Sequence, residues 1–477
     1  MKEFRNFFTA GGHTAVRRIR YVCKACGTDR FMLRTDADGN CEITYGNARG
    51  KRYAEREVAR RKENMFIGRA HDHADFTWRG IVEGYYGRPY TADDRKDLLD
   101  FMDEMRMNIY LYAPKDDPYH REKWREPYPQ EESEALRELC AYAADRAIEM
   151  CYCISPGLDM RYSDEQDVRT LIEKIKALQA LGFGEIALLF DDIKAELLPI
   201  DAERFASAAQ AQASVTAAVQ EALGRRVLFC PTDYWQNNDT PYRADLRTHL
   251  PREAAVLWTG YNTVAEYIDA ADAANAAQWF DRELWLWDNY PVNDFMTERL
   301  FLGALRNRDT TLSASHKGML MNPMEYPSLS KFALFTAARY MWNADTYDPD
   351  QAERDAAAAL VPQAPAEALR LIRDNAACVM YTPAKTCDPA ERQRAYRKLQ
   401  KALPPAMQAE LRPYFDYAQT EYQAYKRLQS GKDATRLIQK LNASAVRTAY
   451  NAFDTEMERH GEYAYTAKKI RECYRCV

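Results

Sequence analysis

The sequence lacks any long apolar segment, and no window approaches the roughly 20 apolar residues that a membrane-spanning helix needs. The first residues, MKEFRNFFTAGGHTAVRRIR, contain neither the apolar core nor the cleavage-like motif of a secretory signal, so we expect a cytoplasmic protein. The net charge is only −5, which excludes a strongly basic nucleic-acid binder. We therefore expect neither nucleic acid nor a membrane as a partner.

The sequence also lacks an even, clustered set of cysteines. Its eleven cysteines are scattered, and several fall in predicted core strands, such as Cys151, Cys153 and Cys230. This pattern is typical of reduced thiols in a cytoplasm and not of a disulfide framework. At 477 residues, the chain is long enough for one large domain with one or two smaller ones.

Residues 1–75 are basic and show no regular pattern, and we expect a small N-terminal region there. They contain a CxxC pair, a turn-like DADGN and one charged run, YAEREVARRKENM, that predicts a helix.

From residue 76 onward, short apolar runs alternate with amphipathic segments whose apolar residues recur three and four positions apart. The apolar runs predict eight strands, at residues 78–86, 108–114, 150–156, 185–192, 226–234, 255–260, 283–289 and 317–323. Eight regular strand–helix units favour an α/β fold of the (β/α)8 TIM-barrel type over residues 76–345, with its last helix at 328–342. An open, doubly wound sheet is the alternative. Residues 346–477 show helical periodicity with few strand signals, which predicts a helical C-terminal domain.

The most informative motif is GEIALLFDDI, an apolar strand that ends in Asp191 and Asp192. Parallel barrels place active-site residues at the C-terminal ends of their strands. Two adjacent carboxyls at low dielectric do not both ionise freely, so one serves as a proton donor and the other as an anion. A pair that caps the next helix is the alternative. Because strict strand alternation points neighbouring side chains to opposite faces, the chain must turn at Asp191 if both acids serve one site.

Polar and aromatic residues follow the other predicted strands at the same rim. Acids, amides, aromatics and one lysine suit hydrogen bonding to sugar hydroxyls and stacking on a sugar ring. The candidate binding residues are Gly84, Tyr86, Lys115, Tyr234, Thr259, Trp287, Asn289, Asp294 and Asn322.

Eight runs from the predicted barrel resemble one known family. They are RGIVEGYYGRPY, NIYLYAPKDDPYHREKWRE, ISPGLD, ALLFDDI, LFCPTDYW, VLWTG, LWLWDNYPVNDF and KGMLMNP. Together they resemble the glycoside hydrolase family that contains protein O-GlcNAcase and bacterial β-N-acetylglucosaminidases (family eighty-four). The resemblance covers residues 77–342 and is weak or absent for residues 1–75.

The resemblance implies a role for most of the candidate residues. Asp191 contacts the acetamido nitrogen of the substrate, and Asp192 is the general acid and then the general base. Tyr234 and Asn289 hydrogen-bond near the acetamido group. The Gly84 backbone, Lys115, Asp294 and Asn322 bind sugar hydroxyls by the same resemblance. Trp287 and Tyr86 line the pocket.

The activity that the resemblance implies is retaining, exo-acting hydrolysis of terminal β-linked GlcNAc on a glycoconjugate or an O-GlcNAc-modified protein. The 2-acetamido group of the substrate is the nucleophile and forms an oxazoline intermediate, so catalysis needs no cofactor. A hyaluronidase-like endo-β-N-acetylglucosaminidase and a non-catalytic sugar-binding barrel are the alternatives. A metal-dependent barrel hydrolase built on His71 and His73 is disfavoured, because both residues precede the first predicted strand and the chain has only seven histidines.

Two CxxC pairs lie near the two ends of the sequence, Cys23 with Cys26 and Cys473 with Cys476. Structural zinc takes four ligands, often all cysteine thiolates, so the two pairs together predict one structural zinc site. Cys41, His71 and His73 are alternative ligands that would complete a site within residues 1–75. Unrelated free thiols are the remaining interpretation.

Overall fold

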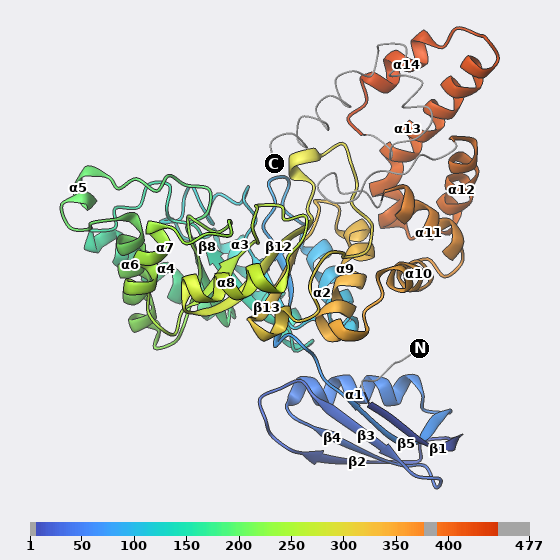
Figure 1. Cartoon of the computed structure of the whole chain (residues 1–477), viewed down its shortest axis with the longest axis horizontal. Helices are drawn as coiled ribbons and strands as arrows, with labels where there is room; N and C mark the ends of the chain where they lie inside the picture. The colour runs from blue at the N-terminus through green and yellow to red at the C-terminus, as the bar shows by residue number, and fades with distance from the viewer. Residues whose placement is uncertain (1–5, 376–388, 447–477) are drawn as a thin grey trace.

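The computed structural model describes residues 6–375 and 389–446 (Figure 1). The chain begins with a five-stranded sheet in the order β1-β5-β3-β4-β2. Its elements are β1 (Asn6–Thr14), β2 (Arg18–Cys23), β3 (Phe31–Thr35), β4 (Asn40–Tyr45), α1 (Ala48–Arg60) and β5 (Met65–Asp72). The interpretation of residues 1–75 as irregular was therefore wrong. Strand β2 is exposed along almost its whole length, so it carries no alternating apolar pattern to reveal it.

Helix α1 covers one face of this sheet and lies between the sheet and the rest of the molecule (Figure 1). It overlaps the charged run that predicted a helix, but it begins earlier, where the Asn47 side chain accepts a hydrogen bond from the backbone N–H of Gly50. Its buried face, including Tyr53 and Val58, packs on sheet residues such as Ile43.

Eight parallel strands form a closed barrel, which confirms the predicted (β/α)8 fold. They are β6 (Trp78–Glu83), β7 (Ile109–Tyr112), β8 (Glu149–Ile154), β9 (Glu185–Leu189), β10 (Leu228–Cys230), β11 (Ala255–Trp258), β12 (Glu283–Pro291) and β13 (His316–Asn322). Each predicted strand overlaps one of these. The largest difference is at β10, which begins later and ends earlier than predicted, because its last predicted residues belong to a loop at the barrel rim.

Helices surround the barrel. They are α2 (Ala92–Glu104), α3 (Gln130–Ala144), α4 (Glu165–Leu181), α5 (Pro199–Ala202), α6 (Ala208–Leu223), α7 (Pro241–His249), α8 (Ala270–Phe280) and α9 (Pro327–Trp342). Short 3₁₀ turns lie at η1 (Asp294–Met296), η2 (Leu312–Ala314) and η3 (Ala344–Thr346). The local sequence sets these boundaries: Thr91 and Asp94 form a reciprocal capping box at the start of α2.

Both faces of each barrel strand are covered, so the strands are nearly continuous apolar runs. In β9, Ala187 and Leu189 face the apolar cluster inside the barrel, whereas Ile186 and Leu188 face the cluster under the helices. This alternation matters for the site, because Asp191 continues the inward series and Asp192 does not.

The N-terminal sheet is fixed to the barrel at the N-terminal ends of the strands. Buried Arg79 of β6 donates to Asp29 Oδ2 at 2.6 Å, and Asn108 Nδ2 donates to the same oxygen at 3.0 Å. Trp342 Nε1, at the end of α9, donates to Asp72 Oδ2 at 3.0 Å. The sheet therefore supports the end of the barrel opposite to the one that carries the predicted site.

Helices follow the barrel, as predicted: α10 (Pro349–Leu360), α11 (Pro365–Asp374), α12 (Pro389–Ala402), α13 (Pro405–Gln429) and α14 (Thr435–Asn442). Helix α9 has no side-chain cap of its own, and Glu410 of α13 accepts from the backbone N–H groups of Ser328 and Leu329 at 3.0 and 2.8 Å. The domain boundaries proposed at residues 75 and 345 stay predictions. Within the described ranges, no helix is long and apolar enough to cross a membrane.

Candidate active site

Asp191 and Asp192 follow β9 directly and reach the same pocket. Asp191 continues the inward-facing series of Ala187 and Leu189. Asp192 would face outward, but its φ of 53° is left-handed and turns the chain. Its carboxylate thereby meets side chains from β6 and β10 loops. The turn that a shared site requires is present, one residue later than the sequence predicted.

All eleven predicted site residues line one pocket of about 160 Å³ at the C-terminal ends of the barrel strands. They come from β12 and β13 themselves and from the loops after β6, β7, β9, β10, β11 and β12. Their individual roles stay predictions. The lining also includes residues that the sequence did not single out, namely Cys230, Thr263, Val264, Val292 and Phe295.

Asp191 is held by a buried ion pair. Lys115 Nζ lies 2.5 Å from Asp191 Oδ2, and the two side chains are 2% and 8% exposed. Burial alone would raise the pKa of Asp191, but the Lys115 ammonium outweighs it and lowers that pKa. The second oxygen, Oδ1, is buried and accepts no hydrogen bond from any described residue. Asp191 is therefore an anion with one oxygen anchored and one available to a ligand.

Asp192 is more exposed than Asp191 and accepts hydrogen bonds from two hydroxyl groups. Tyr86 Oη donates to its Oδ2 at 2.8 Å, and Tyr234 Oη donates to its Oδ1 at 3.0 Å. Burial raises the pKa of both tyrosines, so each keeps its proton and acts as a donor. Both oxygens of Asp192 are thus oriented from opposite walls of the pocket.

An amide network forms the floor of the pocket. Asn289 Oδ1 accepts from Trp287 Nε1 and from Asn322 Nδ2, each at 2.9 Å. Asn289 Nδ2 donates to the Thr263 carbonyl at 2.6 Å, which leaves its second N–H for a ligand. The Asn322 oxygen accepts from the Gly84 N–H at 3.4 Å. Each amide is therefore fixed in one orientation.

The remaining predicted residues form the walls. Gly84 packs so closely on Trp287 that a Cβ would lie 2.4 Å from the indole Cζ2. Asp294 Oδ2 accepts from the Tyr86 N–H at 2.9 Å, and burial raises the pKa of Asp294. Thr259 is buried and donates to the Asn262 carbonyl at 3.1 Å.

Arg121 contacts the site and was missed by the sequence reasoning. It lies on the loop between β7 and α3, where Nη1 donates to Tyr86 Oη at 2.9 Å and Nη2 donates to the Asp192 carbonyl at 3.1 Å. It does not sit at a strand end, where parallel barrels place their active-site residues. Its place in the run NIYLYAPKDDPYHREKWRE was the only signal available.

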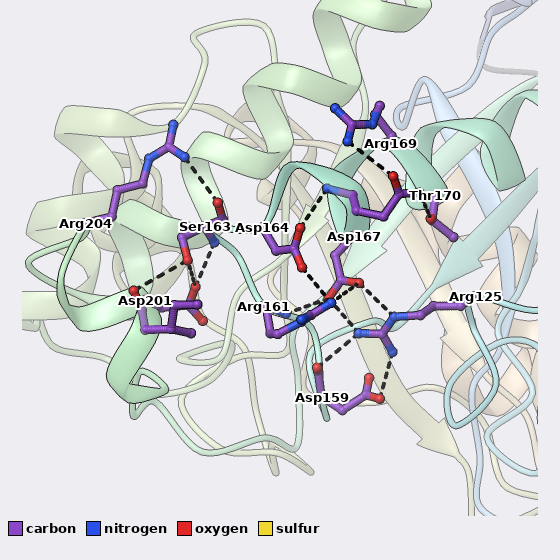
Figure 2. Close-up of polar contacts among 12 residues, drawn as sticks. Arg125, Asp159, Arg161, Ser163, Asp164, Asp167, Arg169, Thr170, Asp201 and Arg204 are labelled. Carbon is purple, nitrogen blue, oxygen red and sulfur yellow. Dashed lines mark hydrogen bonds and ion pairs between the residues drawn. The ribbon is translucent and has the colours of Figure 1, made fainter.

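The loops that carry these residues are tied together outside the pocket (Figure 2). Arg125, on the same loop as Arg121, pairs with Asp159 and with Asp167, each at 2.7 Å. The Ser163 N–H in turn donates to buried Asp201 at 2.7 Å. These contacts join the loop after β7 to the segments after β8 and β9.

Within residues 6–375 and 389–446, no group of three or more His, Cys, Asp or Glu side chains is arranged to hold a metal ion. Cys23 and Cys26 are exposed at the end of β2, whereas Cys41 is buried. Cys473 and Cys476 lie outside the described residues. His71 and His73 belong to the N-terminal region, with ring centroids 5.4 Å apart, and neither lines the pocket.

Residues 79–374 match a family model described as beta-N-acetylglucosaminidase. The chain belongs to this family. That membership confirms the resemblance seen in the eight barrel motifs and identifies the chain as a relative of glycoside hydrolases.

The chain is also similar to protein O-GlcNAcase of Rattus norvegicus and of Mus musculus. Each is 40% identical to this chain over 252 residues, which is 51% of this chain but only 28% of the relative. The matched part therefore spans less than a third of those proteins.

Two solved structures share the fold. The Thermobaculum terrenum O-GlcNAc hydrolase, in a mutant form, is 28% identical with a TM-score of 0.69, covering 82% of this chain and 90% of that one. The structure of CpGH84B has a TM-score of 0.77 at 23% identity and covers 91% of this chain and 86% of that one. The second comparison supports the fold alone.

Proposed function

We propose that this chain is a retaining, exo-acting β-N-acetylglucosaminidase in which the 2-acetamido group of the substrate attacks the anomeric carbon. Asp191 carries this proposal. Its anchored, anionic carboxylate has one buried oxygen that accepts no hydrogen bond from the described residues, and an acetamido N–H would find an acceptor there. Accepting that N–H orients the acetamido carbonyl and stabilises the positive charge that develops as the oxazoline forms.

Asp192 serves as the general acid and then as the general base. In its protonated form it delivers a proton to the departing oxygen, and its anion later takes a proton from the attacking water. Acid–base assistance of this kind contributes roughly 10²–10⁴-fold to the rate. In the free protein, Tyr86 and Tyr234 donate to its two oxygens, and substrate binding releases at least one of these oxygens for the leaving group.

The proposed sugar contacts follow from the fixed groups around the two acids. The Asn289 N–H and Tyr234 hydroxyl face the acetamido region, and Trp287 supplies an apolar wall. The hydroxyls of the sugar bind Lys115, Asp294, Asn322 and the Gly84 backbone. A pocket of about 160 Å³ is smaller than typical drug-sized sites of roughly 300–1,000 Å³, which favours one terminal sugar over an internal unit of a polymer.

We propose GlcNAc-bearing glycoconjugates, including O-GlcNAc-modified proteins, as the substrate class. The named relatives are O-GlcNAcases and an O-GlcNAc hydrolase, which supports this choice. A cytoplasmic location is also a proposal. It agrees with the seven described cysteines, which are all free thiols.

The test is turnover of 4-nitrophenyl β-GlcNAc beside the matching β-GalNAc and β-glucose compounds. We expect hydrolysis of the GlcNAc compound and none of the glucose compound, because glucose lacks the acetamido nucleophile. Equal turnover of both would contradict substrate assistance, and failure on both would favour a sugar-binding barrel. Release of free GlcNAc from an oligosaccharide end, and not of larger fragments, would exclude the endo-acting alternative.

A structural zinc held by Cys23, Cys26, Cys473 and Cys476 remains a separate proposal that rests on sequence spacing alone. Elemental analysis of untagged protein and of Cys476→Ser tests it. Absence of bound zinc in the parent contradicts the site, and unchanged zinc in the variant moves it away from the second CxxC pair.

A further inference from the structure

Arg121 links the proposed general acid to an aromatic wall of the pocket. Its guanidinium contacts two groups at once, the Tyr86 hydroxyl at 2.9 Å and the Asp192 carbonyl at 3.1 Å. Tyr86 closes the triangle by donating to Asp192 Oδ2 at 2.8 Å. The Arg121 side chain is largely buried, whereas the Tyr86 and Asp192 side chains that it helps to hold are exposed.

The chemistry of these groups fixes the direction of each hydrogen bond. A guanidinium donates and cannot accept. The Tyr86 oxygen therefore accepts from Arg121, and its own proton is directed to Asp192. Without Arg121, the same hydroxyl could rotate away or accept a proton from Asp192 instead. Arg121 thus selects one of the arrangements that the tyrosine and the aspartate can adopt.

The second contact acts on the backbone of Asp192. This residue has a left-handed φ of 53°, and its exposed side chain lacks the packing that usually fixes a catalytic group. The hydrogen bond from Arg121 Nη2 to its carbonyl restrains the turn that directs the carboxylate into the pocket. Arg121 therefore constrains both ends of the residue, the carbonyl directly and the carboxylate through Tyr86.

One loop supplies the cations for both acids. Lys115 and Arg121 lie on the loop between β7 and α3, and they contact Asp191 and Asp192 respectively. Arg125 anchors the same loop to its neighbours through Asp159 and Asp167 (Figure 2). The two adjacent acids after β9 are thus contacted by two cations from a single loop.

We infer that Arg121 is a positioning residue for the general acid, which it holds through the Tyr86 hydroxyl and through the Asp192 backbone carbonyl. This inference rests on the proposed function. It predicts a defect confined to proton delivery, since Arg121 does not line the sugar pocket itself.

The experiment compares aryl β-GlcNAc substrates whose leaving groups differ in their need for protonation. Arg121→Met should lower kcat for the phenyl glycoside by about tenfold to a hundredfold, because phenol is a poor leaving group that needs a proton. The same variant should lower kcat for the 2,4-dinitrophenyl glycoside by less than about threefold. KM should change little for either. Arg125→Gln is the matched control, because it removes an arginine from the same loop without touching Asp192, and any loss should be equal for both leaving groups.

A double-mutant cycle tests the route through the tyrosine. If the Tyr86 hydroxyl transmits part of the effect, Tyr86→Phe should cost less in the Arg121→Met background than in the parent. A uniform loss across leaving groups, or fully additive effects, would overturn the inference. If thermal melting shows that Arg121→Met is not folded, Arg121→Lys is used in its place. The lysine keeps the charge but replaces the two guanidinium nitrogens, which make one contact each, by a single nitrogen, so a parent-like dependence on the leaving group would also overturn the inference. Inactivity of the parent on 4-nitrophenyl β-GlcNAc would contradict the proposed function instead.

Discussion

Lys115 and Asp191 form a buried ion pair across the mouth of the barrel, although β8 separates the strands that carry them. The Lys115 ammonium also lies 5.8 Å from the ring centroids of both Tyr86 and Trp287, so it is enclosed by aromatic faces. In this setting the lysine holds Asp191 anionic in a place where burial favours the neutral acid.

Loss of this lysine should change the pH dependence of hydrolysis. In Lys115→Met, burial is no longer opposed, so the pKa of Asp191 rises above its present lowered value. Because the mechanism needs the Asp191 anion, the acidic limb of the kcat/KM profile should move to higher pH. Lys123→Met, an exposed lysine on the same loop, is the control. An acidic limb that stays in place in Lys115→Met would show that Asp191 does not set it.

The two acids should fail in different ways. Asp192→Asn should reduce turnover most for poor leaving groups, by roughly 10²–10⁴-fold, and least for leaving groups that depart without a proton. Asp191→Asn should reduce turnover for all leaving groups, because it removes the acceptor of the acetamido N–H. The measurement is a series of aryl β-GlcNAc substrates with each variant. Full activity of either variant on poor leaving groups would contradict the assignment.

Gly84 should not accept a side chain. A Cβ there would lie 2.4 Å from the Trp287 ring, so Gly84→Ala must displace the indole and weaken its hydrogen bond to Asn289. Overpacking of this kind costs about 1–3 kcal/mol, which corresponds to a loss in kcat/KM of roughly fivefold to 150-fold if the whole cost is expressed at the site. Thermal melting and kinetics measured together show whether the substitution lowers stability, kcat/KM or both. Parent-like kinetics would mean that Trp287 does not shape the sugar site.

Because of Glu410, the free energy of unfolding should decrease as the pH rises from mildly acidic to neutral. Burial raises its pKa from 4.5 to about 7, although it accepts two N–H groups at the start of α9. Between these values the unfolded chain is ionised while the folded chain is still protonated, so stability declines as pH rises, by about 3 kcal/mol at most. Glu410→Gln removes this titration. The difference in melting temperature, variant minus parent, should therefore be larger at pH 8 than at pH 5. Glu138→Gln, at an exposed position, is the control. An unchanged difference at the two pH values would contradict the assignment.

The barrel could be predicted from sequence because its strands are buried on both faces. A run such as EIALL is apolar after its first residue, and loops and amphipathic helices separate it from the next strand. The N-terminal sheet could not be predicted in the same way. Its β2 strand, RIRYVC, is almost entirely exposed, and only its parallel pairing with β4 makes it a strand.

The site could be predicted where its residues follow strands and not where they lie in loops. Asp191 and Lys115 come directly after β9 and near the end of β7, so fold geometry brings them to one rim. Arg121 reaches the site only because the long loop folds back onto Asp192, and no local periodicity encodes that path. The left-handed backbone of Asp192 likewise depends on contacts from other loops.

The central claim, that the acetamido group is the nucleophile, is tested most directly by weakening that group without removing it. Replacing the N-acetyl methyl of 4-nitrophenyl β-GlcNAc by mono-, di- and trifluoromethyl makes the carbonyl oxygen progressively less nucleophilic. We predict that kcat/KM falls stepwise along this series, because the carbonyl attacks in the transition state. A kcat/KM that does not respond to fluorination would contradict the account and indicate that a protein carboxylate or water attacks instead.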